Sequence, residues 1–474
     1  MNIADLTALS PFIVLTITPV VVMLAISFYR CHELTVILTL LGLVLAVASL
    51  PSAARHIPRE VTPLLIIDGF ALYYLGLILT AAIIVSALSY SYVNIHAGHR
   101  EEFYLLLLLA TLGCAVLTAA SHFASLFLGV EILSVSLYAL IAYLRHNERS
   151  VEAGVKYLIL AAVSSAFILF GMALVYAETG SLAFNRTGIP ISSVDLHPVS
   201  LTAGFALIIA GLGFKLAVVP FHMWTPDVYE GAPAPVSAFI ATASKGAVFA
   251  VVLRYFSLKD IHGQSAQFLI FTSTAIASMF FGNLLALLQN NVKRILAYSS
   301  ISHLGYLLIT LLAVGSMAGT AAAFYLTAYF ITTLGAFGVV TVLSKEDRDA
   351  DGLDDYRGLA WKHPWLAAVF TAMLFSLAGI PLTAGFVGKF YIAAAGVGSH
   401  LWLLTAVLVI NSAIGLYYYL RIIVVLFTRS ETASDGPSLS FSGSSALAIL
   451  AFLLISLGIY PGPVIDLIRK AMTF

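Results

Sequence analysis

The sequence predicts an all-α integral membrane protein with about 14 transmembrane helices. Hydrophobic residues make up 61% of its 474 residues and charged residues only 10%, whereas a typical soluble domain has about 25% charged residues. The mean hydropathy is +1.01. Apolar runs of about 20 residues, the length that crosses the hydrocarbon core of a bilayer, recur along the whole chain. Together these observations exclude a water-soluble globular protein.

The predicted spans follow one another with short connections. They cover residues 10–29, 34–53, 69–93, 103–120, 122–144, 152–177, 200–222, 235–256, 266–288, 299–316, 318–344, 364–395, 401–428 and 445–468. The first run, beginning near Ser10, has no basic region before it and no small-residue cleavage site after it. It is therefore expected to be a spanning helix rather than a removable signal peptide.

Two spans are interrupted by glycine and proline beside a lysine. The seventh reads Gly211-Leu-Gly-Phe-Lys215-Leu-Ala-Val-Val-Pro220, and the twelfth reads Leu377-Ala-Gly379-Ile-Pro381-Leu-Thr-Ala-Gly385-Phe-Val-Gly-Lys389. Proline removes a backbone donor and clashes with the preceding turn, so each helix is expected to break there. In a membrane such breaks are tolerated only where they are buried in protein or line a polar cavity.

The positions of the two breaks predict internal repeats in a single membrane domain of residues 1–474. Helices 1–3 occupy residues 1–101, helices 4–8 residues 102–256, helices 9–13 residues 266–428, and the last helix residues 445–468. Each five-helix block has its broken helix second from last. Because five is odd, the two blocks must be inverted relative to the membrane, the arrangement that places ion pathways between repeats in many transporters.

Charged side chains inside the spans are the candidate functional residues, because charges in hydrocarbon are costly and usually functional. Four lysines, Lys156, Lys215, Lys245 and Lys389, lie within apolar segments, and Glu131 is the one carboxylate that falls in the middle of a span. Each central lysine opposes insertion by about 2.5 to 3.5 kcal/mol. Lys293 is assigned to a cytoplasmic loop beside Arg294 and leaves the set.

These residues predict a path for protons. Burial disfavours a charged ammonium and a nearby carboxylate opposes that effect, so Glu131 and Lys215 form either a switchable pair or a static ion pair. Lys245 and Lys389 would continue the path, with His303 as either a relay or a structural donor. Lys156 lies nearer a helix end, where it either takes part or extends to the membrane interface.

Other features of the sequence limit the chemistry of this chain. Cys31 and Cys114 are its two cysteines, too few for a structural zinc site or a four-cysteine cluster. His222 has no second ligand at metal-binding spacing. The formal net charge is zero, and no dense run of lysine and arginine predicts a nucleic-acid partner. The charged segment 345–363 is expected to be a solvated loop or a docking surface, and segment 429–445 a flexible connection.

Lysine and arginine in the short loops predict the orientation, since they concentrate on the cytoplasmic side. Assigned to that side are Arg30, Arg100, Arg145, Arg149, Lys293, Arg294, Lys345, Arg348, Arg357, Lys362 and Arg429. Assigned to the external side are Arg55, Arg59, Arg186, Arg254, Lys259, Arg469 and Lys470. More of these basic residues fall on the side assigned as cytoplasmic, which predicts that both termini lie outside.

Several motifs carry a resemblance that covers nearly the whole chain. They are Gly129-Val-Glu131, the run from Gly213 to Pro235, Ala243-Ser-Lys245, Tyr298-Ser-Ser-Ile-Ser-His-Leu-Gly-Tyr306 and Leu377 to Phe390. With them the chain resembles the antiporter-like membrane subunits of bacterial proton-pumping NADH:quinone oxidoreductase, respiratory complex I. The run from Gly213 to Pro235 is the most specific of these motifs.

The resemblance implies a proton-translocating subunit of the bacterial inner membrane. It implies roles for Glu131 and Lys215 as a coupled pair, Lys245 as a linking site and Lys389 as the terminal site. It also implies that this chain does no redox chemistry, with NADH, FMN, iron–sulfur clusters and quinone on partner subunits, and that its partners are other membrane subunits and the lipid bilayer. The alternatives are a subunit of a multisubunit cation/proton antiporter without a redox partner, and a scaffold with inert lysines.

Overall fold

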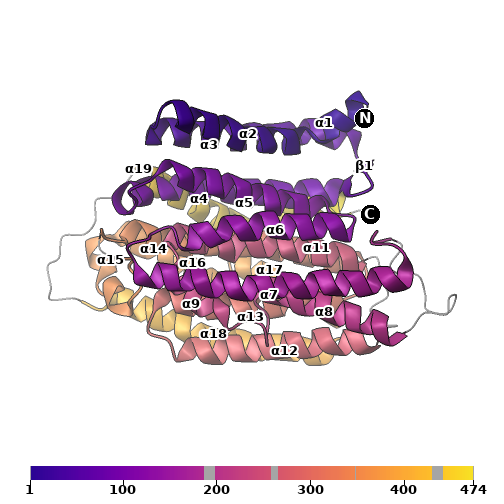
Figure 1. Cartoon of the computed structure of the whole chain (residues 1–474). Coiled ribbons are helices and arrows are strands. Elements are labelled where there is room, and N and C mark those ends of the chain that lie inside the picture. Colours follow the sequence, from indigo (N-terminus) through magenta and orange to yellow (C-terminus); the bar gives the residue numbers. More distant parts are fainter. Residues whose placement is uncertain (1, 186–197, 258–264, 347, 430–440, 473–474) are drawn as a thin grey trace.

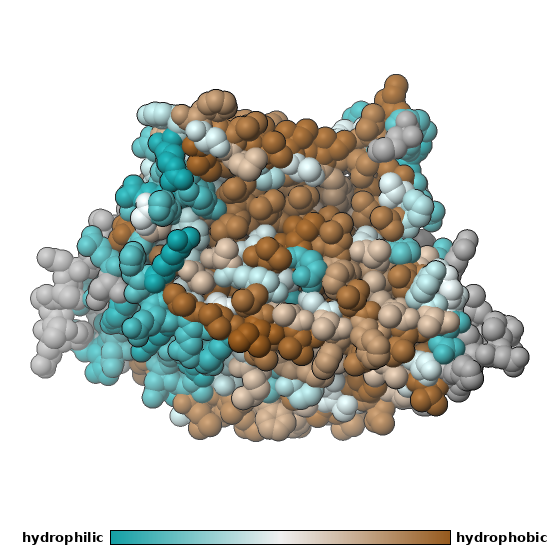
Figure 2. Space-filling model, viewed as in Figure 1, coloured by the Kyte–Doolittle hydropathy of each residue, from teal (hydrophilic) through white to brown (hydrophobic). Residues whose placement is uncertain are grey.

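The computed structural model describes residues 2–185, 198–257, 265–346, 348–429 and 441–472, and is a bundle of long helices (Figure 1). Thirteen helices of the described residues are long and apolar enough to cross a membrane, and two shorter apolar helices lie in the chain between the last two of them and the rest. Both chain termini lie at the same end of the bundle. A broad apolar band covers its side, with hydrophilic residues gathered towards the two ends (Figure 2). The predicted fold class is confirmed.

The N-terminal part consists of a helical hairpin, a small sheet and one long helix. Its elements are α1 (Ile3–Ala8), α2 (Ser10–Phe28), α3 (His32–Ala53), η1 (Ala54–His56), β1 (Arg59–Thr62), β2 (Leu65–Ile67) and α4 (Gly69–His96). The strands pair antiparallel, with Arg59 opposite Ile67. They lie in a connection that the hydropathy pattern left without structure.

The middle of the chain contains the first broken helix. Its elements are α5 (Glu101–Ala119), α6 (Phe123–Ile141), α7 (Glu148–Thr179), α8 (Pro198–Leu216), α9 (Trp224–Gly231), α10 (Ala234–Phe239), η3 (Ile240–Ser244) and α11 (Lys245–Ser257). The segment η3 is a π-helix that joins α10 to α11 in one span. Such π turns are frequent at functional sites, and this one ends directly before Lys245.

The remaining elements contain the second broken helix. They are α12 (Ser265–Leu287), α13 (Val292–Leu312), α14 (Ser316–Leu343), η4 (Leu353–Tyr356), α15 (Leu359–Lys362), α16 (Pro364–Ala378), α17 (Ala384–Gly398), α18 (Trp402–Phe427), α19 (Phe441–Ile459) and α20 (Gly462–Ala471). The core lies at α10–α11, α13 and α14. In the most apolar part of these spans, 100%, 100% and 94% of the residues are buried, against 33% in α2 and in the span that begins with α3. The central helices therefore face protein on all sides.

Both predicted breaks are present. In the first, α8 ends at Leu216 and Ala217 adopts a positive φ of 59°. The indole of Trp224 donates to the carbonyl of Phe214 (3.0 Å), which satisfies one of the carbonyls that the helix end leaves open. In the second break, α16 ends before Gly379, whose φ is +87°, and the Thr383 side chain caps the start of α17.

Two predicted boundaries differ most from the structure. The tenth span, predicted over 299–316, begins at Val292, because the Asn291 side chain accepts from the Arg294 amide (3.0 Å) and starts the helix seven residues earlier. The last span, predicted to reach residue 468, ends at Ile459. The next residue precedes Pro461, a position that disfavours helix, and the separate helix α20 follows.

One basic residue assigned to an external segment lies inside the protein instead. Arg254 is in α11 and only 5% exposed, where it forms a two-pronged ion pair with Asp68 (2.7 and 2.8 Å) and donates to the Thr118 carbonyl (3.2 Å). Of the other residues used for the orientation, Arg186 and Lys259 lie outside the described residues.

Candidate functional site

Three of the predicted lysines are buried in the bundle and share one type of environment. Lys215, Lys245 and Lys389 are 4%, 1% and 8% exposed. Each ammonium donates to a serine hydroxyl, and each lies 5 to 6 Å from the centre of an aromatic ring. The serine bonds are Lys215 to Ser134 (2.7 Å), Lys245 to Ser300 (2.7 Å) and Lys389 to Ser412 (2.8 Å). The ring distances are 5.8 Å to Tyr157 for Lys215, 5.2 Å to Tyr229 for Lys245 and 5.3 Å to Tyr306 for Lys389.

Glu131 and Lys215 lie near each other but are not joined directly. The Glu131 carboxylate accepts from the Ser165 hydroxyl, while Lys215 donates to Ser134, one turn after Glu131 on α6. Positions three residues apart share a face of a helix, and the two charges still act on each other electrostatically. The expected direct ion pair is therefore absent from the described contacts, and α6 connects the two groups instead.

Lys389 joins the two helices that meet at the second break. Its three ammonium protons are all used, because it donates to the carbonyls of Leu377 and Ala378 (2.9 Å each) as well as to Ser412. Those carbonyls belong to the last turn of α16, where the helix leaves acceptors without a partner and favours a positive charge. Lys389 thus holds together the two halves of the broken helix.

His303 lies between two tyrosines. Its Nδ1 is 2.6 Å from the Tyr325 hydroxyl and its Nε2 is 3.2 Å from the Tyr419 hydroxyl, and Tyr419 also bonds Ser299. A neutral imidazole has one donor and one acceptor nitrogen. A tyrosine hydroxyl can donate to the acceptor nitrogen or accept from the donor nitrogen. Both neutral tautomers of His303 therefore fit this position.

The structure separates Lys156 from the buried lysines. Its side chain is 44% exposed and pairs with Glu152 (2.7 Å) and Asp227 (2.9 Å). Exposed pairs of this kind contribute at most about 1 kcal/mol to stability. Of the two alternatives for Lys156, the exposed side chain fits a position at the membrane interface better than a place among the buried lysines.

Lys293 corrects the assignment to a loop. It lies in the first turn of α13, and its side chain is 0% exposed. The ammonium donates to Asp349 (2.6 Å) and to the carbonyls of Glu230 (2.8 Å) and Ala232 (2.6 Å) at the end of α9. The earlier start of α13 explains the error, because it moves Lys293 from a connection into the protein.

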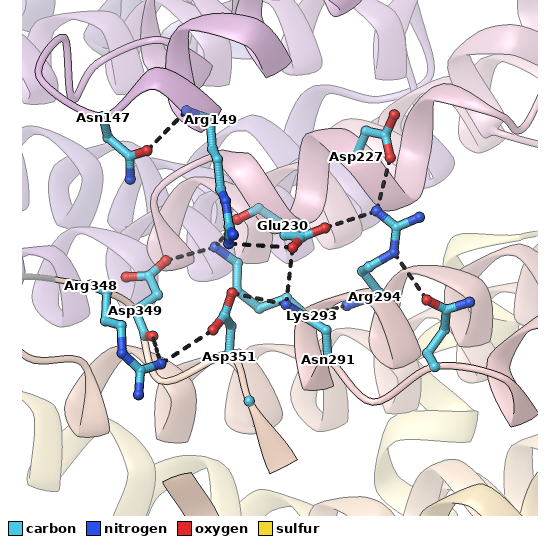
Figure 3. A network of polar contacts seen from close by, with 12 residues as sticks. Asn147, Arg149, Asp227, Glu230, Asn291, Lys293, Arg294, Arg348, Asp349 and Asp351 are labelled. Atoms are coloured by element: carbon cyan, nitrogen blue, oxygen red, sulfur yellow. Dashed lines mark hydrogen bonds and ion pairs between the residues drawn. The ribbon is translucent and has the colours of Figure 1, made fainter. Parts of the chain in front are cut away.

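A network of ion pairs surrounds Lys293 (Figure 3). Arg294 bridges Asp227 (2.9 Å) and Glu230 (2.8 Å), and Asn291 donates to Asp351 (2.8 Å). Burial alone raises the pKa of the Asp349 carboxyl, but the Lys293 ammonium overcomes this and the pKa lies below its usual value. Part of segment 345–363 is therefore fixed against α9 and α13, rather than being a simple solvated loop.

The serine and aromatic partners of the lysines were missed by the sequence reasoning. Ser134 could have been found, because it follows Glu131 by three residues and must share its face of the helix. Ser300 and Ser412 lie 55 and 23 residues from their lysines, and no local pattern marks them. Among the described residues, no three His, Cys, Asp or Glu side chains lie close enough together to hold a metal ion.

Comparisons with known proteins agree with this architecture. The family described as NADH:quinone oxidoreductase/Mrp antiporter, TM, matches residues 120–415. NADH-quinone oxidoreductase subunit N of Ectopseudomonas mendocina (strain ymp) is 50% identical over 477 residues, covering 98% of this chain and 96% of that protein.

Solved structures give the same fold. A chain of respiratory complex I from Thermus thermophilus, determined with bound aureothin, is 33% identical with a TM-score of 0.82, covering 96% of this chain and 98% of that one. A chain of the Mrp complex from a Dietzia species has a TM-score of 0.88 at 20% identity, covering 100% and 97%, and this likeness shows the fold alone. The chain therefore belongs to the NADH:quinone oxidoreductase/Mrp antiporter family, and within it to the subunit N group of NADH-quinone oxidoreductases.

Proposed function

We propose that this chain conducts protons across the bacterial inner membrane as a subunit of NADH:quinone oxidoreductase, through Glu131, Lys215, Lys245 and Lys389. Electron transfer from NADH to quinone takes place on partner subunits, which carry FMN and the iron–sulfur clusters. The chain works among other membrane subunits of that complex, and 50% identity to a subunit N over nearly its whole length supports this assignment. An antiporter without a redox partner has less support, because the matching family includes both kinds of protein and the chain of the Mrp complex shares the fold at only 20% identity.

The observation that carries the proposal is a contrast between two kinds of buried lysine. Lys293 is fully buried and bonds a carboxylate at 2.6 Å, as a lysine retained for structure should. In the described parts of the chain, Lys215, Lys245 and Lys389 have no carboxylate within ion-pair distance and bond neutral oxygen atoms instead. A buried ammonium with only neutral partners is costly, and release of its proton removes that cost.

Glu131 is suited to control the first of these sites. It lies on the half-exposed face of α6, between the exposed side chains of Leu128 and Val135. A carboxylate at membrane depth is not stable against lipid, so we expect a partner subunit to cover this face. A change at that contact would alter the electrostatic effect of the Glu131 carboxylate on Lys215. Redox energy released in other subunits can reach the lysines in this way.

The repeats and the orientation are part of the same proposal. The broken pairs α8–α9 and α16–α17 hold equivalent places in residues 102–256 and 266–428, which supports two inverted five-helix repeats. Both termini lie at one end of the bundle (Figure 1). The loops with Arg30, Arg100 and Arg145 come at the other end, which is the cytoplasmic end by the positive-inside rule.

Replacing Lys215 by methionine tests the proton route. In the complex purified with all subunits and reconstituted in liposomes, Lys215→Met should lower the rate of proton pumping by at least about tenfold, because proton transfer by a positioned group contributes at least that much to a rate. Lys156→Met is the matched control, since this lysine is exposed and outside the buried set. Unchanged pumping by a normally assembled Lys215→Met complex would contradict the proposal.

A further inference from the structure

A small polar cavity lies beside Lys389, between α13, α14, α16 and α17. Its volume is about 10 Å³, and its polar lining consists of His303, Tyr325, Tyr329, Thr332, Ser376 and Lys389. A water molecule needs a volume of about this size and two to four polar partners. The cavity therefore suits one buried water molecule, held between the helix that carries His303 and the helix that carries Lys389.

Tyr329 has a hydroxyl whose hydrogen-bonding capacity is not used. The residue is 4% exposed, and its hydroxyl has no hydrogen-bond partner among the described residues. Buried polar atoms nearly always have a partner in the protein or in ordered water. Since Tyr329 also lines the cavity, a water molecule placed there would supply the missing partner.

The same hydroxyl approaches the Lys245 site. Ser300 accepts the Lys245 ammonium at 2.7 Å, and the ring of Tyr329 lies 5.4 Å from the ring of His303, which follows Ser300 by one turn on α13. Tyr329 thus stands between the serine that holds Lys245 and the cavity that reaches Lys389. We infer that the Tyr329 hydroxyl, with one water molecule in this cavity, is the proton bridge between Lys245 and Lys389.

The transfer conserves protons at every step. Ser300 accepts the Lys245 proton and gives its own hydroxyl proton to Tyr329, and Tyr329 gives its proton to the cavity water. The water then protonates a neutral Lys389 whose amine has turned from one of its three described acceptors towards the cavity. Each oxygen keeps its number of bonded protons, and one positive charge moves from Lys245 to Lys389. The hydroxyls must then turn back before the next transfer.

Ser300 is positioned to interrupt this bridge. In the described conformation its hydroxyl donates to the Ala297 carbonyl (2.8 Å), so its proton points away from Tyr329. Conduction therefore requires rotation of the Ser300 hydroxyl. On the other side of the cavity, His303 is held between Tyr325 and Tyr419 and fixes the wall of the water site.

The test is Tyr329→Phe in the complete complex in liposomes, and it rests on the proposed function. The variant removes one hydroxyl and keeps the ring, so assembly and thermal stability should match the wild type. The rate of proton pumping should fall by at least about fivefold, because one proton-transfer group is lost. The matched control is Tyr74→Phe, a tyrosine of α4 that is 1% exposed, has a hydroxyl without a partner among the described residues, and does not line the cavity. It should pump normally.

Two further measurements separate the possible failures. A structure of the assembled wild-type complex that resolves water should show a water molecule in this cavity bonded to the Tyr329 hydroxyl, and Tyr329→Phe should lose it. A dry cavity, or normal pumping by Tyr329→Phe while Lys215→Met and Lys245→Met do not pump, overturns the bridge alone. Normal pumping by the lysine variants themselves overturns the proposed function and the bridge with it.

Discussion

Lys389→Arg is expected to assemble and to lower the rate of proton pumping by at least about tenfold. Arginine keeps the positive charge and the donors that bind the carbonyls of Leu377 and Ala378 at the second break. It cannot release its proton in a protein. The substitution therefore preserves the structural function of Lys389 and removes only the exchange of a proton. The measurement is proton uptake by liposomes together with NADH oxidation by the same sample.

Two other variants make this result specific. Lys389→Met removes the charge and the donors together, so it should also lower the thermal stability of the complex, because two carbonyls lose their partner. Lys156→Arg changes an exposed lysine in the same way and should leave pumping unchanged. If Lys389→Arg pumps as many protons as the wild type, Lys389 is a structural residue and not a proton site.

Lys293→Met is expected to destabilise the protein by about 3 to 5 kcal/mol, the usual cost of breaking a buried ion pair by removing one partner. The substitution leaves the Asp349 carboxylate buried without its cation, and leaves the carbonyls of Glu230 and Ala232 at the end of α9 without a donor. Thermal unfolding of the purified complex and its yield from membranes should both fall. Lys293→Met with Asp349→Asn should recover part of the loss.

The pH dependence of Lys293→Met has a definite sign. In the wild type the pKa of Asp349 lies below its usual value because of Lys293. The stability that this pair contributes is therefore complete above the usual carboxyl pKa of about 4, and is lost as the pH falls through the lower folded value. Without Lys293, burial raises the pKa of Asp349 and is opposed only by the Tyr92 hydroxyl and by His96. The variant should then be closer to the wild type in stability at pH 5 than at pH 8. If the variant is less stable than the wild type by the same amount at pH 5 and at pH 8, this account of Asp349 is contradicted.

The spans and the breaks could be predicted because their causes are local. A run of apolar residues of sufficient length must cross the bilayer, and proline with glycine interrupts a helix through its own backbone. The two largest boundary errors were also local in origin. The cap at Asn291 and the turn before Pro461 are visible in the sequence, but hydropathy alone does not record them.

The sequence by itself determined that this chain is a membrane bundle with two broken helices, and that Lys215, Lys245 and Lys389 lie inside it. Only the tertiary structure decided which buried charges have a counter-ion. Lys293 and Asp349 are 56 residues apart, and Lys215 and Ser134 are 81 apart. Such partners meet only when the helices pack, since the energy of a charge depends on the atoms within a few ångströms of it. For that reason the lysine that appeared to be an ordinary loop residue is the paired one, and the three without a carboxylate are the candidates for carrying protons.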